Sequence, residues 1–253
     1  LGLSATPDKG EFGEDMTKAI EENIGDVIYK FDLDLAIKRG ILCEFNYIPL
    51  NYSLGEEDFL RRKRILGQIK KRKEEKNPMT EMEQRIALSK VYKLCENKLV
   101  AFEDFVGKNP DILESTIIFV EDSFFGEKVL DILQKYTNSY RTYYGGYDIN
   151  ILKDFIKENI GVLVTCEAIS QGIDIPNLKN IVIFSSNKSS RGQTIQRIGR
   201  CLRNPKSTIK KIAKVIDFFE VRDDSKESYD QERYDWLKDL SKIKFEKENS
   251  FVK

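Results

Sequence analysis

From Ser115 onward the chain alternates short apolar runs with amphipathic stretches, and this alternation restricts its fold more than any other feature. Helical patterns such as GEKVLDILQKY and NILKDFIKEN separate the runs. The runs are rich in β-branched or aromatic residues and are expected to be strands at 116–120, 139–144, 161–165, 180–184 and 213–219. Apolar strands that alternate with helices form a parallel sheet with helices on both faces, and ligands bind at the carboxyl ends of its strands. The chain is therefore predicted to be an α/β protein.

The region before Ser115 has a different texture. Residues 14–40 have the pattern of a polar helix that Gly40 ends, and CEFNYIPLNYSL at 43–54 alternates as an exposed or edge strand does. Residues 56 to about 107 carry helical spacing only, until KNP at 108–110 ends the pattern. We therefore expect an inserted helical segment there. Its first part has a narrow apolar stripe, which consists of Phe59, Leu60, Ile65, Leu66 and Ile69.

The inserted segment also carries a local concentration of positive charge. Nine basic residues lie between positions 61 and 76 against two acidic ones, although the whole chain has 42 basic and 42 acidic residues. The densest part is Lys70, Lys71, Arg72 and Lys73. Two interpretations stay open: a solvated surface helix, or a clamp that contacts nucleic-acid phosphates without reading bases.

Composition excludes several classes of chemistry. The chain has no histidine, which removes the usual general base and the Ser-His and Cys-His nucleophiles. Its four cysteines are scattered without a C-x-x-C pair, so a structural metal site is not expected and a reduced, cytoplasmic location fits best. No apolar run approaches the roughly 20 residues of a membrane span, so no membrane partner is expected. Any catalysis must rest on carboxylates, arginines and positioning.

The segment RGQTIQRIGRCLR at 191–203 follows the fourth expected strand. If it is helical, Gln196, Arg200 and Arg203 lie within about 60° of one another at 100° per residue, with Arg197 to one side. Ile195, Ile198 and Leu202 fall on the opposite side and anchor the helix. Guanidinium groups held close together repel unless an anion lies between them, and they suit phosphate oxygens. The segment therefore indicates phosphate binding at the sheet edge, or alternatively a solvated basic helix face.

A second segment, TCEAISQGIDIP at 165–176, follows the third expected strand. Asp174 lies between two isoleucines that direct its carboxylate away from the core, and Gly172 permits close backbone approach. The carboxylate is placed to hold a ribose hydroxyl or an arginine, or else it caps a turn. Thr165 ends the strand, where its hydroxyl and nearby backbone N–H groups suit a phosphate.

Four segments, in order along the chain, resemble motifs of superfamily 2 helicases. Ser4, Ala5 and Thr6 resemble motif III, TIIFVED resembles motif IV, VTCEAISQGIDIP resembles motif V and QRIGRCLR resembles motif VI. Glutamine at 196 and Arg-Cys-Leu-Arg at 200–203 resemble the DNA branch that includes xeroderma pigmentosum B-type repair helicases and restriction-enzyme translocases. RNA helicases of the DEAD-box type are the weaker match.

The resemblance implies a motor of two RecA-like domains, with ATP and Mg²⁺ in the cleft between them and nucleic acid across both. It implies arginine fingers at Arg203 and Arg200, with Gln196 sensing the γ-phosphate. It further implies that the remaining motif residues contact ATP (Gly172, Asp174 and Arg197), couple the domains (Ser4, Ala5 and Thr6) and grip nucleic-acid phosphates (Thr165, Glu121, Asp122 and Ser123). The segment YYGGYDINILKDF departs from the family, which often has His-Gly and a later arginine there.

A P-loop, G-x-x-x-x-G-K-[ST], is missing from this sequence, and no expected strand ends in an Asp-Glu pair that would hold Mg²⁺. We therefore expect residues 1–25 to be the tail of a first RecA-like domain and a linker, 26–220 the second RecA-like domain with the insertion, and 221–253 a C-terminal helical extension. The predicted function is the C-terminal half of an ATP-dependent DNA helicase or translocase, inactive without its N-terminal RecA-like domain. The competing hypothesis is a non-hydrolysing nucleic-acid-binding or scaffold domain with a helicase-like fold.

Overall fold

The protein is described by a computed structural model, which gives the placement of most of the chain. The described residues are 14–26, 28–29, 31–145, 148–166, 175, 177–185, 191–204, 211–222 and 227–246.

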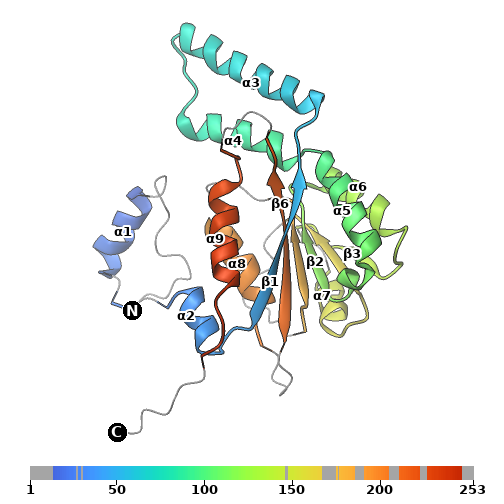
Figure 1. Cartoon of the computed structure of the whole chain (residues 1–253). Coiled ribbons are helices and arrows are strands. Elements are labelled where there is room, and N and C mark those ends of the chain that lie inside the picture. Colours follow the sequence, from blue (N-terminus) through green and yellow to red (C-terminus); the bar gives the residue numbers. More distant parts are fainter. Residues whose placement is uncertain are drawn as a thin grey trace.

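From β2 onward most of the described strands are followed by a helix (Figure 1). The strands are β1 (Glu44–Tyr52), β2 (Thr116–Phe119), β3 (Tyr140–Thr142), β4 (Val162–Thr165), β5 (Asn180–Ile183) and β6 (Ile212–Glu220). The helices before β2 are α1 (Glu14–Ile24), α2 (Leu33–Lys38), α3 (Glu56–Glu74), α4 (Glu81–Lys93), α5 (Asn97–Lys108) and the 3₁₀ turn η1 (Pro110–Leu113). The later helices are α6 (Ser123–Leu133), α7 (Ile149–Ile156), α8 (Arg191–Cys201) and α9 (Gln231–Ser241).

The six strands form one parallel sheet in the order β1-β6-β5-β2-β4-β3. Each of the five strands expected after Ser115 is present, with ends within three residues of the predicted ones. The edge strand expected at 43–54 is β1, which pairs with β6 from Glu44 opposite Ile212 to Tyr52 opposite Glu220. Pro49 lies within β1 and has no N–H to donate, which an edge strand tolerates because one side of it is unpaired. The predicted α/β fold is confirmed.

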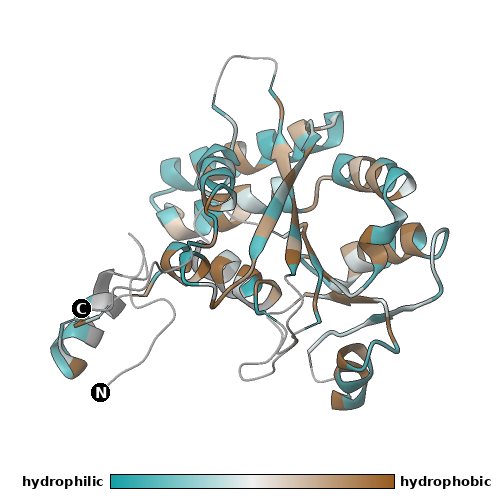
Figure 2. Cartoon of the chain, turned by 60° about the horizontal axis from the view of Figure 1, so that its bottom comes forward, coloured by the Kyte–Doolittle hydropathy of each residue, from teal (hydrophilic) through white to brown (hydrophobic). Residues whose placement is uncertain are grey.

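Helices cover both faces of the sheet. On one face α2, α7, α8 and α9 bury side chains such as Ile37, Phe155, Ile198 and Leu237 against the sheet. On the other face α5, α6 and the end of α4 form a second core with side chains such as Phe102, Val129 and Tyr92. Figure 2 shows mixed apolar and polar colouring on the helices around the sheet, as expected when one side of each helix faces the core. Each described helix is too short or too polar to cross a bilayer.

Two expectations about helix boundaries were wrong. Residues 14–40 form two helices, because Gly25 adopts a φ of +104° directly after α1 and ends it. Gly40 ends α2 as expected, with a φ of +68°. Helix α8 ends at Cys201, so Arg203 lies beyond it and pairs with Leu42 in an isolated β-bridge.

The inserted segment predicted at 56–107 is three helices. Helices α3 and α4, which we call the helical arm, leave the sheet after the carboxyl end of β1, and α3 projects away from the sheet (Figure 1). The apolar stripe expected on α3 is only partly used: Ile65 and Ile69 are half-buried, whereas Phe59, Leu60 and Leu66 are about half exposed. The reason is that α3 packs mainly against α4 alone.

Candidate functional site

Part of the predicted site lies outside the described residues. These positions are Ser4, Ala5, Thr6, Gly172 and Asp174. Gln196 and Arg200 lie in α8, but the structure describes only their main chain and not their side chains. The roles implied for these residues stay predictions, and the described part of the site consists of Arg197, Arg203 and the carboxyl edge of the sheet.

Helix α8 follows β5 and runs back along the face of the sheet. Its buried side chains Ile198 and Cys201 hold it in the core, and Cys201 Sγ donates a hydrogen bond to the carbonyl oxygen of Lys179 at 3.7 Å. Lys179 precedes β5, so the end of α8 lies near the amino-terminal edge of the sheet. The sequence analysis placed Arg203 at the carboxyl edge of the sheet. It lies near the opposite edge instead, because a helix that follows a parallel strand runs back along that strand.

The main chain around Arg203 is fixed from two sides. Cys43 N–H donates to the carbonyl oxygen of Leu202 at 2.7 Å, and the ammonium of Lys211 donates to the carbonyl oxygens of Cys201 at 2.6 Å and Arg203 at 3.0 Å. The residue itself is exposed. The structure thus fixes the main chain that carries Arg203 and leaves the residue accessible at the surface.

Arg197 is buried in the structure. Its guanidinium carbon lies 4.6 Å from the centre of the Phe119 ring, and its Nη1 donates to the carbonyl oxygen of Ser185 at 3.0 Å. Burial lowers the pKa of Arg197 to about 10, and the negative charge of Glu121 acts in the opposite direction. Among the described residues its Nε–H has no hydrogen-bond partner. The resemblance implies that Arg197 contacts ATP. In this structure its guanidinium is enclosed between α8 and the strand ends.

The segment predicted to grip phosphates lies at the carboxyl edge. Thr165 is the fully buried last residue of β4, and its carbonyl oxygen accepts a hydrogen bond from Val120 N–H at 2.9 Å. Asp122 caps α6, with Oδ1 accepting from Phe125 N–H at 2.8 Å, and Ser123 is the first residue of that helix. Glu121 forms an ion pair with Lys93. Two carboxylates lie in this segment, so a phosphate there would depend on backbone N–H groups, as predicted, and on neutralisation of Glu121 by Lys93.

The departure from the family at 143–147 has a structural counterpart in Tyr144. A Cβ atom at position 126 would lie 2.0 Å from Tyr144 Oη, so Gly126 of α6 provides the space that the tyrosine occupies. The contact places this loop against the helix that follows Glu121–Ser123. Sequence reasoning missed it, although the unusual pair Tyr143-Tyr144 was a signal that a different contact exists there.

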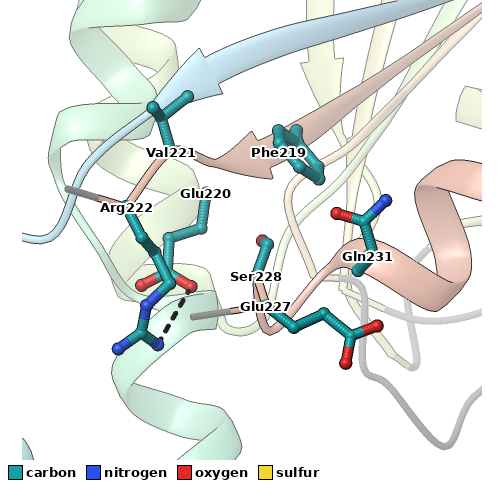
Figure 3. A pocket seen from close by; sticks show the side chains of 7 residues that line it. All are labelled: Phe219, Glu220, Val221, Arg222, Glu227, Ser228 and Gln231. Carbon is teal, nitrogen blue, oxygen red and sulfur yellow. Dashed lines mark ion pairs between the residues drawn. The ribbon is translucent and has the colours of Figure 1, made fainter. Parts of the chain in front are cut away.

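A surface cavity of about 420 Å³ lies away from the predicted site, between the end of β6 and the start of α9 (Figure 3). Glu220 and Arg222 line it and form an ion pair at 3.8 Å. Burial raises the pKa of the Glu220 carboxyl. None of the predicted site residues lines this cavity.

The basic cluster on α3 is exposed along most of its length. Lys70 and Lys71 lie 4.0 Å and 3.7 Å from Glu74 and Glu75, and such exposed pairs are weak. Arg72 is held more firmly, because its Nε donates to the carbonyl oxygen of Asn77 at 3.1 Å. Most of this charge is therefore available to an anionic partner.

One segment of the chain, which contains Glu121, Thr165, Arg197 and Arg203, matches a known family. Residues 97–205, from α5 past the end of α8, match the helicase conserved C-terminal domain. This part of the chain is thus similar to a helicase C-terminal domain. The parallel sheet with helices on both faces agrees with the RecA-like fold expected from the sequence.

Two solved structures share the fold of this chain. The SWI2/SNF2 ATPase core domain of Sulfolobus solfataricus has a TM-score of 0.52 and 14% identity, and the match covers 90% of this chain and 49% of that one. A fragment assigned to the HsdR subunit of a type I restriction enzyme from Vibrio vulnificus YJ016 has a TM-score of 0.52 and 18% identity, over 81% of this chain and 37% of that one.

One curated relative is more similar in sequence over a shorter region. DEAD-box ATP-dependent RNA helicase 22 of Arabidopsis thaliana is 35% identical over 94 residues. The match covers 36% of this chain and 16% of the relative. The chain thus corresponds to less than half the length of each of these three proteins.

Proposed function

We propose that this helicase C-terminal domain is the second half of an ATP-dependent motor that translocates on or unwinds DNA. The observation that carries the proposal is the helicase match over 97–205, which includes β2, β4, β5 and α8 in a RecA-like sheet. The choice of DNA rests on the sequence of motif VI, in particular Gln196, and on the likeness of the fold to the SWI2/SNF2 and HsdR structures. The RNA helicase relative favours RNA instead, so the experiment compares the two nucleic acids.

Within this motor we propose that an upstream RecA-like domain holds most of the ATP and Mg²⁺, since this chain contains no P-loop motif. Bound Mg²⁺ would neutralise charge on the phosphates. This domain would supply Arg203 and Arg200 to the γ-phosphate, with Gln196 as a sensor. Gly172, Asp174 and Arg197 would complete the nucleotide contacts, and Ser4, Ala5 and Thr6 would couple hydrolysis to domain movement.

Hydrolysis assays of two proteins test this function. Residues 1–253 alone are expected to show no nucleic-acid-stimulated ATP hydrolysis, because no P-loop amides or lysine cradle the phosphates. The intact protein, including the coding region upstream of Leu1, is expected to hydrolyse ATP faster with DNA than with RNA of the same sequence and length. Greater stimulation by RNA would reverse the proposed substrate. Absence of hydrolysis with either would favour the non-hydrolysing scaffold.

We further propose that the helical arm contacts the nucleic-acid backbone beside the main track. Replacing Lys70, Lys71, Arg72 and Lys73 by glutamine is expected to weaken DNA binding to a similar degree for unrelated sequences. The slope of log affinity against log salt concentration should fall by about 0.9 for each phosphate that the variant no longer neutralises, because fewer counterions are released. DNA titrations of residues 1–253 and of the variant at several salt concentrations measure this slope.

The matched control removes four exposed lysines from the opposite edge of the sheet. Lys108, Lys135, Lys157 and Lys179 all lie in segments that precede strands, far along the chain from the arm. Their replacement by glutamine changes net charge by the same amount and is expected to leave most of the slope intact. Equal slopes for the two quadruple variants would make the cluster on the arm a solvated surface only.

A further inference from the structure

The sheet separates the helical arm from the arginine-bearing helix α8. Tyr92, next to the end of α4, is buried in the core on one face, whereas Ile198 of α8 is buried in the core on the other. Phe119, the last residue of β2, is buried in the core on the α8 side of the sheet. The next residue, Val120, is buried in the core on the arm side. The next residue, Glu121, lies at the carboxyl edge, where the two faces meet.

Glu121 is tied to the arm by a bidentate ion pair. The ammonium of Lys93, the last residue of α4, lies 2.9 Å from Oε2 and 3.1 Å from Oε1 of the carboxylate. The two side chains are only 16% and 20% exposed, unlike most ion pairs of the described surface. A pair that is shielded from water to this extent is weakened less by salt than an exposed one.

Glu121 also acts on Arg197 in α8. The guanidinium of Arg197 stacks on Phe119, two residues before Glu121, and donates to Ser185 through Nη1. Phe119 and Glu121 are two residues apart at the same strand end, and the negative charge of Glu121 raises the pKa of this buried guanidinium, against the larger effect of burial. The Nε–H of Arg197 makes no hydrogen bond to the residues described. A buried cation with an unused donor depends strongly on the nearest carboxylate, because both are screened poorly there.

We propose that Glu121 is a positioning residue shared between Lys93 of the helical arm and Arg197 of α8, and that it transmits the state of the arm to the helix that carries Arg200. Lys93 holds the carboxylate at the sheet edge, and the carboxylate in turn fixes the electrostatic environment of Arg197. Arg200 lies one turn farther along the same helix. Within the proposed motor, contact of the arm with nucleic acid would thereby influence the arginines that meet ATP. This last step rests on the proposed function, whereas the link itself does not.

The link is tested by the side-chain Nε–H signal of Arg197 in ¹H–¹⁵N NMR spectra of residues 1–253, assigned by its loss in Arg197→Lys. Burial protects this proton from exchange with water, so a signal is expected. Glu121→Gln should shift it, and Lys93→Gln should shift it by a smaller amount although Lys93 itself has no contact with Arg197. The control is Lys135→Gln, which removes the 2.7 Å ion pair to Glu103 between α5 and α6 and should leave the signal in place.

Equal positions of the signal in Lys93→Gln and Lys135→Gln would overturn the link. If Lys93→Gln does not fold, Lys93→Arg replaces it, because arginine keeps the ion pair and must leave the signal near its original position. A shift in Lys93→Arg as large as that in Glu121→Gln would then overturn the link.

The consequence for the motor is measured separately in the intact protein. Lys93→Gln is expected to lower the ratio of the DNA-stimulated kcat to the rate without DNA several-fold, whereas Lys135→Gln should leave this ratio unchanged. Loss of basal and stimulated rates in the same proportion would show a general structural role and overturn the coupling. Absence of any DNA-stimulated hydrolysis in the unmodified protein would contradict the proposed function, while the NMR result would still decide the link.

Discussion

Replacing Arg203 by alanine in the intact protein is expected to slow nucleic-acid-stimulated ATP hydrolysis by about 10³-fold, as for other arginine fingers. The guanidinium would meet the γ-phosphate mainly in the transition state, so the affinity for ATP should change far less than the rate. The structure favours this role because the backbone at Arg203 is held by Cys43 and Lys211 while the residue is exposed. Steady-state kinetics together with equilibrium binding of ATP separate the two effects.

Arg141 provides the control for this variant. It is an exposed arginine on β3, at the far edge of the sheet from β1, and its Nη1 donates only to the neighbouring carbonyl of Tyr140 among the described contacts. Arg141→Ala is expected to retain the hydrolysis rate. If Arg203→Ala hydrolyses ATP as fast as Arg141→Ala, Arg203 belongs to a solvated basic surface.

Replacing Arg233 by methionine is expected to lower the free energy of unfolding of residues 1–253 by about 3–5 kcal/mol, because it leaves two carboxylates buried without their cation. Arg233 Nε donates to Asp217 Oδ2 at 2.7 Å, and Nη2 donates to Asp230 Oδ1 at 3.0 Å. All three side chains are at most 5% exposed. Burial alone would lower the pKa of Arg233, but the two carboxylates raise it above its ordinary value. Urea unfolding measures the change in stability.

Two further variants identify the cause of that destabilisation. Lys238→Met on the exposed side of α9 is expected to change stability by less than about 0.5 kcal/mol. Combining Arg233→Met with Asp217→Asn and Asp230→Asn should recover part of the stability, because the unpaired charges are removed. A triple variant less stable than Arg233→Met would show that the carboxylates are stabilised by their other donors, such as Tyr52, whose hydroxyl lies 3.0 Å from Asp230 Oδ2.

The network around Arg233 also changes how the C-terminal extension is viewed. Residues 221–253 were expected as a C-terminal helical extension, and its described helix α9 contributes Leu237 and Leu240 to the same core as α8. Arg233 fastens this helix to β6, and Asp230 joins it to Tyr52 of β1. Helix α9 therefore forms part of the helical layer that packs against the sheet.

The positions and the parallel direction of the strands after Ser115 could be predicted from sequence, because a strand buried on both faces needs an apolar run and a parallel neighbour needs a helical crossover. The motifs were likewise local in sequence, so the family could be recognised without tertiary structure. Of the three residues predicted to anchor the helix of motif VI, Ile198 and Leu202 are completely buried and Ile195 is partly buried.

The fate of individual charged side chains was decided only by tertiary structure. Helical spacing gives Arg197, Lys98 and Arg233 the same polar character as any surface residue, yet all three are buried. Lys98 Nζ donates to the carbonyl oxygen of Phe184 at 3.2 Å, and burial lowers its pKa. Their partners Ser185, Phe184 and Asp217 are 12, 86 and 16 positions away along the chain, and these contacts depend on which helix packs over which strand end. Periodicity determines the face of a helix on which a residue lies, but the elements that pack against that face determine whether its charge meets water, a carboxylate or a carbonyl oxygen.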